Sequence, residues 1–405
     1  MRSVFGRIRS SRPLVAAVML TALGALGACT GSTPGFYPQS GPGQDGGVPT
    51  GEVVGTGAVR VALLLPKSAG ANAGQIATVF RNASELALKD FPGADVQILV
   101  KDTSGTADGG RAAAQAAISE GAELILGPVF APAVSGAGAA ARTAGVPVIA
   151  FSSDASAASP GVYLLSFLPQ EDVARIISYA NSKGRSSYAA LIPDNSYGAV
   201  AEAAFRQAVG RTGGRIVGIE RYKVDPARGV DTADLKAKAT ALAGSARRAD
   251  SIFIPDGGGV PAYAIGVLTA QGINRSAVKF LGSGQWDDPK VLSDRMVAGG
   301  WYPAPDKNGF KSFAPRYAAA YGAQPPRNAT LAYDATVLAA GLVRSAGQRR
   351  FSTGVLTNRD GFLGIDGVFR FNRDGTNERG LAIYEATGSG SNVISPAPKT
   401  FQAVN

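Results

Sequence analysis

The chain has 405 residues, of which 45% are hydrophobic and 17% are charged, and its formal net charge is +10. This length exceeds what one hydrophobic core usually serves, so we expect two domains. The positive charge is mild and spread along the chain, which argues against nucleic-acid binding. A single cysteine excludes an internal disulfide, and the absence of histidine excludes Ser-His-Asp triads and histidine metal sites.

Residues 1–28 have the pattern of a lipoprotein signal peptide. Four arginines precede a run of apolar or small residues from 14 to 28, which is shorter than the roughly 20 residues that a transmembrane helix needs. The run ends in LGAC, which resembles a bacterial lipobox, so Cys29 is the expected site of lipidation and membrane anchoring. The alternative is an uncleaved anchor helix in which Cys29 is buried.

Residues 29–57 are rich in glycine, proline and small polar residues, a composition that favours a flexible tether over a folded element. Thr30 follows the cysteine in place of the aspartate that commonly retains lipoproteins in the inner membrane. We therefore expect a protein in the periplasm, anchored by lipid to the outer membrane rather than the inner one.

Strands and helices alternate from residue 59 onward. Continuous apolar strands are expected at residues 59–66, 95–102, 122–129 and 146–153, with helical segments between them. This spacing is typical of βαβ units, and strands that are apolar throughout indicate a parallel sheet covered on both faces.

A second series of strands follows at residues 187–195, 215–224, 249–258 and 278–286, again separated by helical segments. Later helices are expected around residues 310–321 and 331–346, and then a pair of strands in GVFRFNRDG and LAIYEAT. The predicted fold is α/β, with two doubly wound parallel-sheet lobes joined by a hinge. Lobe 1 is expected to comprise residues 58–166 plus about 300–350, and lobe 2 residues 167–299 plus about 351–395.

The sequence contains no motif that demands catalysis. GxSxG, SxxK and Walker phosphate-loop patterns are absent. Residues 136–141, followed by Asp154, match a loose dinucleotide fingerprint but lie inside a helical segment, where small residues favour close packing instead. Asp287 and Asp288 precede Pro289 and are interpreted as a helix N-cap. We therefore expect no enzyme activity, no cofactor and no metal site.

Polar and aromatic residues follow the carboxyl ends of the predicted strands, where ligands bind in doubly wound sheets. They suit a small polar ligand or a partner loop in a cleft, although each taken singly is also an ordinary turn or cap residue. The candidates are Phe130, Phe151, Ser152, Ser153, Asp154, Tyr197, Asp256 and Trp286.

Several of these segments resemble a known family. The unit AELILGPVFAPAVSGAGAAARTAGVPVIAFSSD is similar to the first-lobe core of type I periplasmic binding proteins of the leucine/isoleucine/valine-binding group. IPDNSYG, which contains Tyr197, resembles the second-lobe ligand loop of that group. GSGQWDDP, GGWYPAPD, LAYDATVLAAG and GFLGIDGVFRFNRDGTNERGLAIYE resemble the lipoproteins known as penicillin-binding-protein activators.

The resemblance also identifies positions where this chain departs from the amino-acid receptors. Ala131 stands where they carry a ligand-binding serine, and Asp154 where they carry a threonine. Pro261 and Ala262 stand where they offer a glutamate to the ligand ammonium. Capture of an amino acid by the usual route is therefore in doubt, because an unpaired ammonium in a closed cleft costs several kcal/mol.

Two hypotheses follow. The first is a non-catalytic, lipid-anchored binding-fold protein that activates peptidoglycan synthesis through a penicillin-binding protein. The alternative is the solute-binding receptor of an ABC transporter for amino acids or amides, whose partner is an ABC permease. An enzyme of unfamiliar type is a third possibility.

Overall fold

A computed structural model describes residues 47–401 of the chain. The predicted signal peptide, the lipidation site at Cys29 and most of the predicted tether lie outside the described residues.

The first part of the chain forms a six-stranded sheet in the order β1-β3-β2-β4-β5-β6. All neighbouring strands are parallel except β1, which pairs antiparallel with β3. The strands are β1 (Glu52–Val54), β2 (Val59–Leu65), β3 (Val96–Asp102), β4 (Leu124–Leu126), β5 (Val148–Ala150) and β6 (Val162–Leu164). The elements between them are α1 (Ala71–Asp90), α2 (Ala107–Ser119), α3 (Ala131–Ala144) and the short 3-10 helix η1 (Ala155–Ala157).

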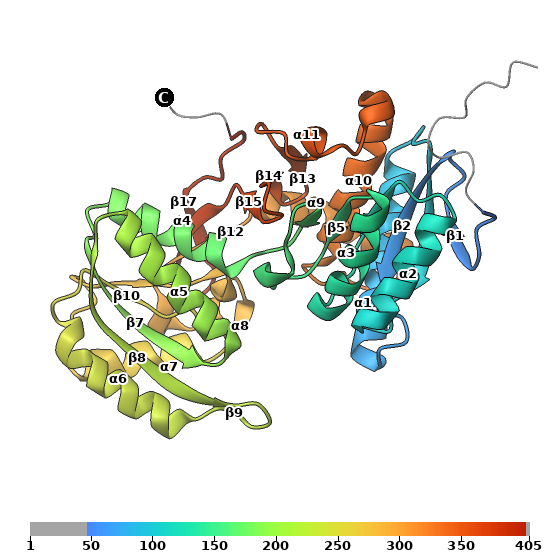
Figure 1. The fold of residues 1–405 in the computed structure, drawn as a ribbon. Coiled ribbons are helices and arrows are strands. Elements are labelled where there is room, and N and C mark those ends of the chain that lie inside the picture. Colours follow the sequence, from blue (N-terminus) through green and yellow to red (C-terminus); the bar gives the residue numbers. More distant parts are fainter. Residues whose placement is uncertain (1–46, 402–405) are drawn as a thin grey trace, which may run out of the picture. The chain divides into compact units, whose positions relative to one another are not determined.

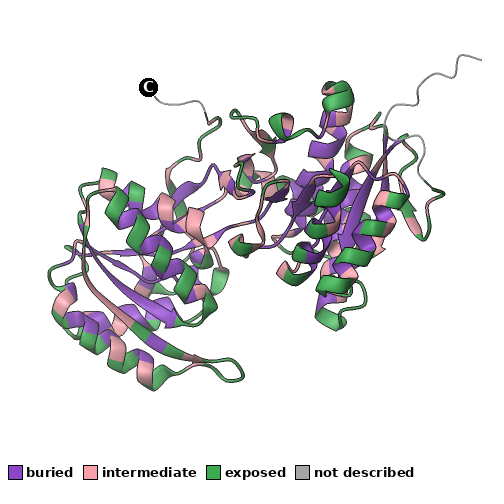
Figure 2. Ribbon diagram, viewed as in Figure 1, coloured by how far each residue is buried: buried purple, intermediate pink, exposed green. Residues whose placement is uncertain are grey.

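Alternate side chains of each strand supply two separate cores, as the pleat of a strand dictates. Val61, Leu63 and Leu65 of β2 pack in a cluster with α1, whereas Ala62 and Leu64 pack in another with α2 and α3. Both faces of the sheet are therefore covered, and Figure 2 shows the strands buried between helices whose outer faces are exposed.

The second sheet has eight strands in the order β17-β16-β12-β11-β10-β7-β8-β9. It is parallel from β8 to β12, and β9, β16 and β17 add antiparallel strands at its two edges. The strands are β7 (Ser187–Asp194), β8 (Arg215–Asp225), β9 (Gly229–Val230), β10 (Ser251–Phe253), β11 (Lys279–Leu281), β12 (Trp301–Ala304), β16 (Ala382–Ala386) and β17 (Ser391–Ser395).

Helices α4 (Pro169–Ser182) and α5 (Ser196–Arg211) contribute to the core on one face of this sheet, and α6 (Thr232–Ala246) and α7 (Val260–Ala270) to the core on the other. Three short helical turns follow β11 and lead to β12: η2 (Gly284–Trp286), α8 (Pro289–Leu292) and η3 (Arg295–Val297). Two sheets of this kind form the two-lobed α/β fold that the sequence predicts, which confirms the fold class (Figure 1).

After β12 the chain returns to the first lobe. Helices α9 (Lys307–Tyr321) and α10 (Ala329–Ser345) bury Phe313, Tyr317 and Leu331 in the same cluster as α1. The turns η4 (Gly347–Arg349) and α11 (Thr353–Leu356) lead to a small antiparallel sheet of β13 (Phe362–Gly364), β14 (Gly367–Phe371) and β15 (Asn377–Arg379).

The two strands expected in GVFRFNRDG and LAIYEAT both form, as β14 and β16. They belong to different sheets, since β14 pairs with β13 and β15, whereas β16 pairs with β12 and β17. Strand pairing and core packing support passages between the lobes after β6, after β12 and after β15. The sequence predicts that the chain changes lobe near residues 300 and 350. These passages favour a change of lobe at about residue 305, after β12, and at about residue 380, after β15.

The structure also differs from the prediction of a tether that extends to residue 57. Strand β1 lies within that range and extends the first sheet, with Glu52 opposite Val100 and Val54 opposite Ile98. Glu52 forms ion pairs with Lys67 at 3.0 Å and with Arg81 at 2.7 Å. These contacts fix a segment whose glycine-rich composition alone suggests no fold.

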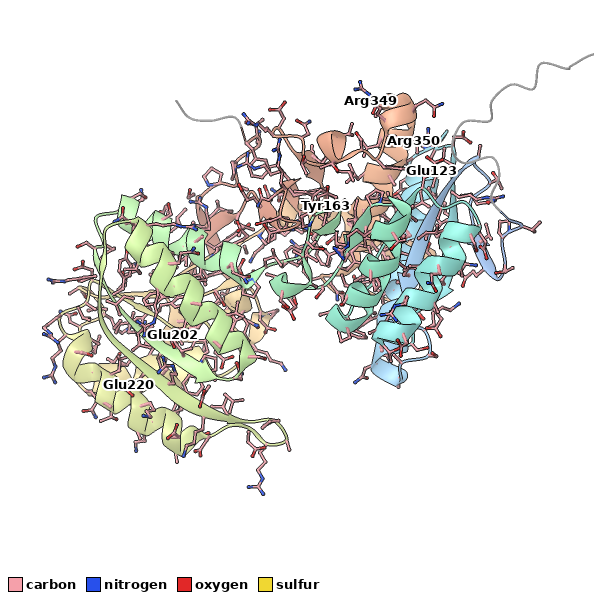
Figure 3. All side chains as sticks on the ribbon, in the orientation of Figure 1. Glu123, Tyr163, Glu202, Glu220, Arg349 and Arg350 are labelled. Carbon is pink, nitrogen blue, oxygen red and sulfur yellow. The ribbon has the colours of Figure 1, made fainter. Side chains whose placement is uncertain are left out.

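Ion pairs join segments that are distant in sequence. Arg350, just after η4, donates from Nε and Nη2 to the two oxygens of Glu123, at 2.9 and 2.8 Å (Figure 3). Glu123 lies directly before β4, so this pair ties the later helical segment to the first sheet.

Candidate functional site

A cavity of about 380 Å³ lies at the carboxyl ends of several parallel strands. This is where doubly wound sheets bind ligands, and the volume falls in the range of small-molecule pockets. Its lining comes from the loop after β5, the start of α4, the start of α5, the η2–α8 turns, the end of β12 and the loop before α10. The residues are Ser153, Phe167, Pro169, Asp172, Tyr197, Gly284, Gln285, Asp287, Asp288, Ala304, Pro305 and Arg327.

Asp172 lies in the first turn of α4, and its Oδ2 accepts a hydrogen bond from the Gly284 N–H at 3.0 Å. A Cβ at Gly284 would lie 2.5 Å from that oxygen, so the contact requires glycine. Burial raises the pKa of the Asp172 carboxyl to about 7. The negative charges of Glu171 and Asp287 also raise this pKa, whereas the hydrogen bond from Gly284 and the positive charge of Arg379 lower it.

The other charged side chains of the cavity form ion pairs or cap a helix. Asp287 forms an ion pair with Lys307 at 2.5 Å, and Asp288 caps α8 by accepting from the Lys290 N–H at 2.6 Å. Arg327 forms an ion pair with Asp366 through Nη1, and the Asp366 side chain is fully buried.

Tyr197 lies in the first turn of α5 and lines the cavity. Its hydroxyl donates to the Pro255 carbonyl at 2.9 Å and lies 2.8 Å from Ser283 Oγ. Burial raises the pKa of the Tyr197 phenol, so it stays neutral at physiological pH. Ser153 is exposed and lines the same cavity. The structure thus brings Tyr197 and Ser153 together, as the sequence suggests.

Asp256 lies in a neighbouring cavity of about 630 Å³ that shares Gln285 with the first. Its Oδ2 accepts from the Tyr222 hydroxyl at 2.5 Å and its Oδ1 from its neighbour Gly257 N–H at 2.8 Å. Both oxygens of this carboxylate therefore have a partner within the lobe.

Four of the first-lobe candidates have structural roles outside the linings of these two cavities. Phe151 is buried and packs edge-on against Phe80, with ring centroids 5.1 Å apart. The buried Ser152 accepts from the Asp154 N–H, and Asp154 in turn caps η1 by accepting from the Ser156 N–H. Phe130 is the N-cap residue of α3.

Ala131, named by the family resemblance, is the first residue of α3 and also lies outside both linings.

The interpretation of Trp286 as a cleft residue is wrong, because its indole is fully buried in the core of the second lobe. Its Nε1–H donates to the Ile254 carbonyl at 2.9 Å. Gly282 and Gly300 provide the space, since a Cβ at either position would collide with the indole. The neighbouring Gln285 faces the cavities instead.

Phe167, Asp172 and Arg327 were not predicted from the sequence, because the candidates were residues that directly follow the predicted strands. Asp172 belongs to the first turn of a helix and Arg327 to the loop before α10. The available signal was the acidic pair Glu171–Asp172 just after Pro169, at the predicted start of the second lobe.

Within residues 47–401, no group of three or more histidine, cysteine or acidic side chains is arranged to hold a metal ion. Over the same residues, no helix combines the length and the apolar character required to cross a membrane.

Comparison with known proteins identifies the family. No curated protein matches the chain. Among solved structures, a protein described as a branched-chain amino acid ABC transporter from Rhodospirillum rubrum has a TM-score of 0.71 and 22% identity, covering 83% of this chain and 99% of its own.

Two further structures have TM-scores of 0.58. A solute-binding protein from Rhodopseudomonas palustris BisB5, in complex with 3,4-dihydroxybenzoic acid, is 21% identical and covers 86% of this chain and 98% of its own. A substrate-binding protein from Desulfitobacterium hafniense, in complex with Leu, is 18% identical and covers 83% and 99%. At such identities the likeness shows the fold. The family model for periplasmic binding proteins matches residues 58–391, and the chain therefore belongs to the periplasmic binding protein family.

Proposed function

We propose that this protein is the solute-binding receptor of an ABC transporter and works in the periplasm with an ABC permease. The observation that carries the proposal is the cavity of about 380 Å³ at the strand ends, lined by residues from both lobes. Binding folds of this type close two lobes around a ligand, which the permease then receives. The three similar structures named above, all described as ABC transporter components, support the same role.

The experiment that tests the role is uptake in cells that carry a deletion of the gene. Loss of uptake of one solute class, restored by the full chain, supports a receptor. A pull-down of the full chain from detergent-solubilised envelope should recover an ABC permease. Unchanged uptake of amino acids, amines, amides and aromatic acids together with no permease in the pull-down would contradict the proposal.

The activator hypothesis has weaker support than the receptor hypothesis. The strings GSGQWDDP and GGWYPAPD meet around the buried Trp286, where Gly282 and Gly300 accommodate its ring. LAYDATVLAAG and GFLGIDG meet around two buried carboxyls, since the Ile365 N–H donates to Asp334. These strings therefore have a packing role, and they offer no separate evidence of a surface for a synthase. Recovery of a penicillin-binding protein without a permease in the same pull-down would favour the activator.

We also propose that Cys29 is lipidated and anchors the protein to the outer membrane. The LGAC string after a short apolar run and the threonine at residue 30 support this proposal. Changing Cys29→Ser should abolish acylation and release the protein from the membrane fraction or leave it uncleaved. A variant that is processed and fractionates like the wild type would contradict lipidation.

A further inference from the structure

Two carboxyl groups of the cavity, those of Asp172 and Asp288, have no ion-pair partner among the described residues, and Asp172 is the one that burial desolvates. Asp287 pairs with Lys307, Arg327 pairs with Asp366, and Asp288 caps a helix. Asp172 has no ion-pair partner among residues 47–401. Oδ2 of Asp172 accepts from a backbone amide, and its other oxygen accepts no hydrogen bond from a described residue.

We propose that the cavity binds a small ligand carrying a protonated nitrogen, an amine or amidine, and that Asp172 holds this nitrogen. The inference rests on the proposed function, because it names the ligand class of the same cavity. A carboxylate in a partly desolvated site favours a cation that donates hydrogen bonds to it, and such charge-assisted bonds are roughly twice as strong as neutral ones.

The charges around Asp172 favour a cation over an anion. A ligand carboxylate would meet Asp172, Asp287 and Asp288 in the same cavity, and like charges repel. The cation that could attract it, Arg327, is already paired with Asp366. The remaining walls include Phe167, Pro169 and Pro305, which suit an apolar body attached to the charged nitrogen.

Each element packed near Asp172 contributes to its electrostatic environment. Glu171 precedes it on α4, and Arg379 of β15 partly offsets the acidic charge. Tyr197 at the start of α5 stays neutral. The charged groups that face it or share its cavity are Glu171, Arg379, Asp287, Asp288 and Arg327.

This environment makes binding dependent on pH. The pKa of the Asp172 carboxyl is raised to about 7 by burial, so the group is partly protonated in the empty cavity. A bound ammonium favours the carboxylate and releases the proton. Affinity for an amine should therefore fall by up to about tenfold for each pH unit below 7, whereas affinity for a neutral ligand should stay constant.

Calorimetry on the full chain with two matched ligand series tests the proposal. The first is 3-methylbutylamine, 3-methylbutanol and 3-methylbutanoate; the second is benzylamine, benzyl alcohol and benzoate. At pH 8 we expect each amine to bind at least about tenfold more tightly than its alcohol, and each carboxylate to bind most weakly. Titration at pH 6 in two buffers of different ionisation enthalpy should show proton release with the amines only, because the carboxyl of the empty cavity is largely protonated there.

Asp172→Asn keeps the acceptor for the Gly284 N–H but removes the charge, so it should abolish the preference for amines and the pH dependence. Asp294→Asn is the matched control, because this exposed carboxylate caps η3 in the same lobe and lies outside the cavity. It should leave the preference unchanged. Circular dichroism verifies the fold of each variant. If Asp172→Asn does not fold, carbon-13 NMR of the wild-type carboxyl should show its titration midpoint falling when benzylamine is added.

Several outcomes would overturn the inference. They are an alcohol or carboxylate that binds as tightly as its amine, an amine preference that persists in Asp172→Asn, and no binding of either amine. Binding of leucine or benzoate without binding of amines would overturn the inference and leave the receptor role intact. Unchanged uptake and an empty pull-down, as described above, would instead contradict the receptor role itself.

Discussion

A methyl group at residue 282 would collide with the buried indole of Trp286, because the glycine Cα lies against the ring. Gly282→Ala should therefore lower the free energy of unfolding by about 1–3 kcal/mol, the usual cost of forcing extra volume into a packed core. Chemical denaturation of the full chain measures this. The matched control is Gly244→Ala on the exposed side of α6, where a Cβ meets no described atom within 4 Å.

The control substitution should raise the free energy of unfolding by roughly 0.5–1 kcal/mol, because alanine loses less conformational entropy than glycine in a helix. An unaltered stability of Gly282→Ala would show that Trp286 can move aside, and it would restore this residue as a candidate for the cleft.

Leucine, isoleucine and valine should bind weakly or not at all. Ala131 offers no hydroxyl to a ligand carboxylate, Ala262 offers no acid to an ammonium, and Asp172 lies in a cavity where a carboxylate is repelled. Losing two charge-assisted hydrogen bonds weakens a micromolar site by roughly 100-fold or more. Calorimetry of the three amino acids with the full chain measures this, and 3-methylbutylamine, which is leucine without its carboxylate, serves as the comparison. A micromolar dissociation constant for leucine would contradict the prediction.

At the scale of elements, strand β1 is stabilised by contacts with distant residues, and its own sequence does not predict a strand. It pairs with β3, and Glu52 joins Lys67 and Arg81. A chain that begins at Gly55 should therefore unfold more easily than one that begins at Gly47, by about 1–3 kcal/mol for the lost ladder and packing. Thermal unfolding of the two chains compares them. Equal midpoints would mean that β1 adds nothing to the stability of the first lobe.

The sequence predicted the long, regular elements well and the short or irregular ones poorly. The apolar run of β2 is a strand where one was expected, and the helical segment expected after it is α1. Strand β12 was missed because its four residues, Trp301–Ala304, include a proline and depend on distant partners in β16, from Ala382 to Glu385. Strand order between distant segments has no local signal, so the sequence predicted the two late strands β14 and β16 but not the partners with which they pair.

The residues of the candidate site also divide into those that the local sequence predicts and those that depend on contacts with distant segments. Tyr197 and Ser153 each follow a predicted strand, and both line the same cavity. Trp286 also follows a strand, but whether it turns into a cleft or into the core depends on the space at Gly282 and Gly300, which lie before and after it in the chain. Asp172 escaped prediction because its importance arises from burial and from the pairing of its neighbours, and neither is a property of the local sequence.

At the scale of the whole molecule, the chain is suited to a clear measurement of stability against pH, because it contains no histidine. Burial is the main cause that raises the pKa values of Glu171, Asp172 and Asp334 to about 7. In the unfolded chain these groups titrate near 4. Between pH 4 and 7 the folded protein therefore holds more protons than the unfolded one, and the free energy of unfolding falls as pH rises through this range.

Carboxyls with lowered pKa values, such as Glu202 beside Arg221, act in the opposite direction, but their stabilisation is lost only as pH falls through the folded pKa, below about 4.5. Stability should therefore be greater at pH 5 than at pH 8, with each of these three carboxyls contributing at most about 1.4 kcal/mol per pH unit. Denaturant titrations at half-unit steps of pH, without ligand, measure the slope.

Asp334→Asn should flatten that slope, because it removes one of the three carboxyls with a raised pKa, whatever it does to the stability at any single pH. Asp108→Asn is the control, since this side chain is 96% exposed and should leave the slope unchanged. Asp334→Asn also alters the electrostatic surroundings of Arg379, which affects the stability at any single pH. The slope of stability against pH is therefore the quantity to compare, rather than the stability at one pH. A wild-type protein that is equally stable at pH 5 and pH 8 would contradict this prediction, because it would mean that the three carboxyls remain hydrated in the folded protein. It would also contradict the desolvated carboxyl at Asp172 on which the pH dependence of amine binding rests.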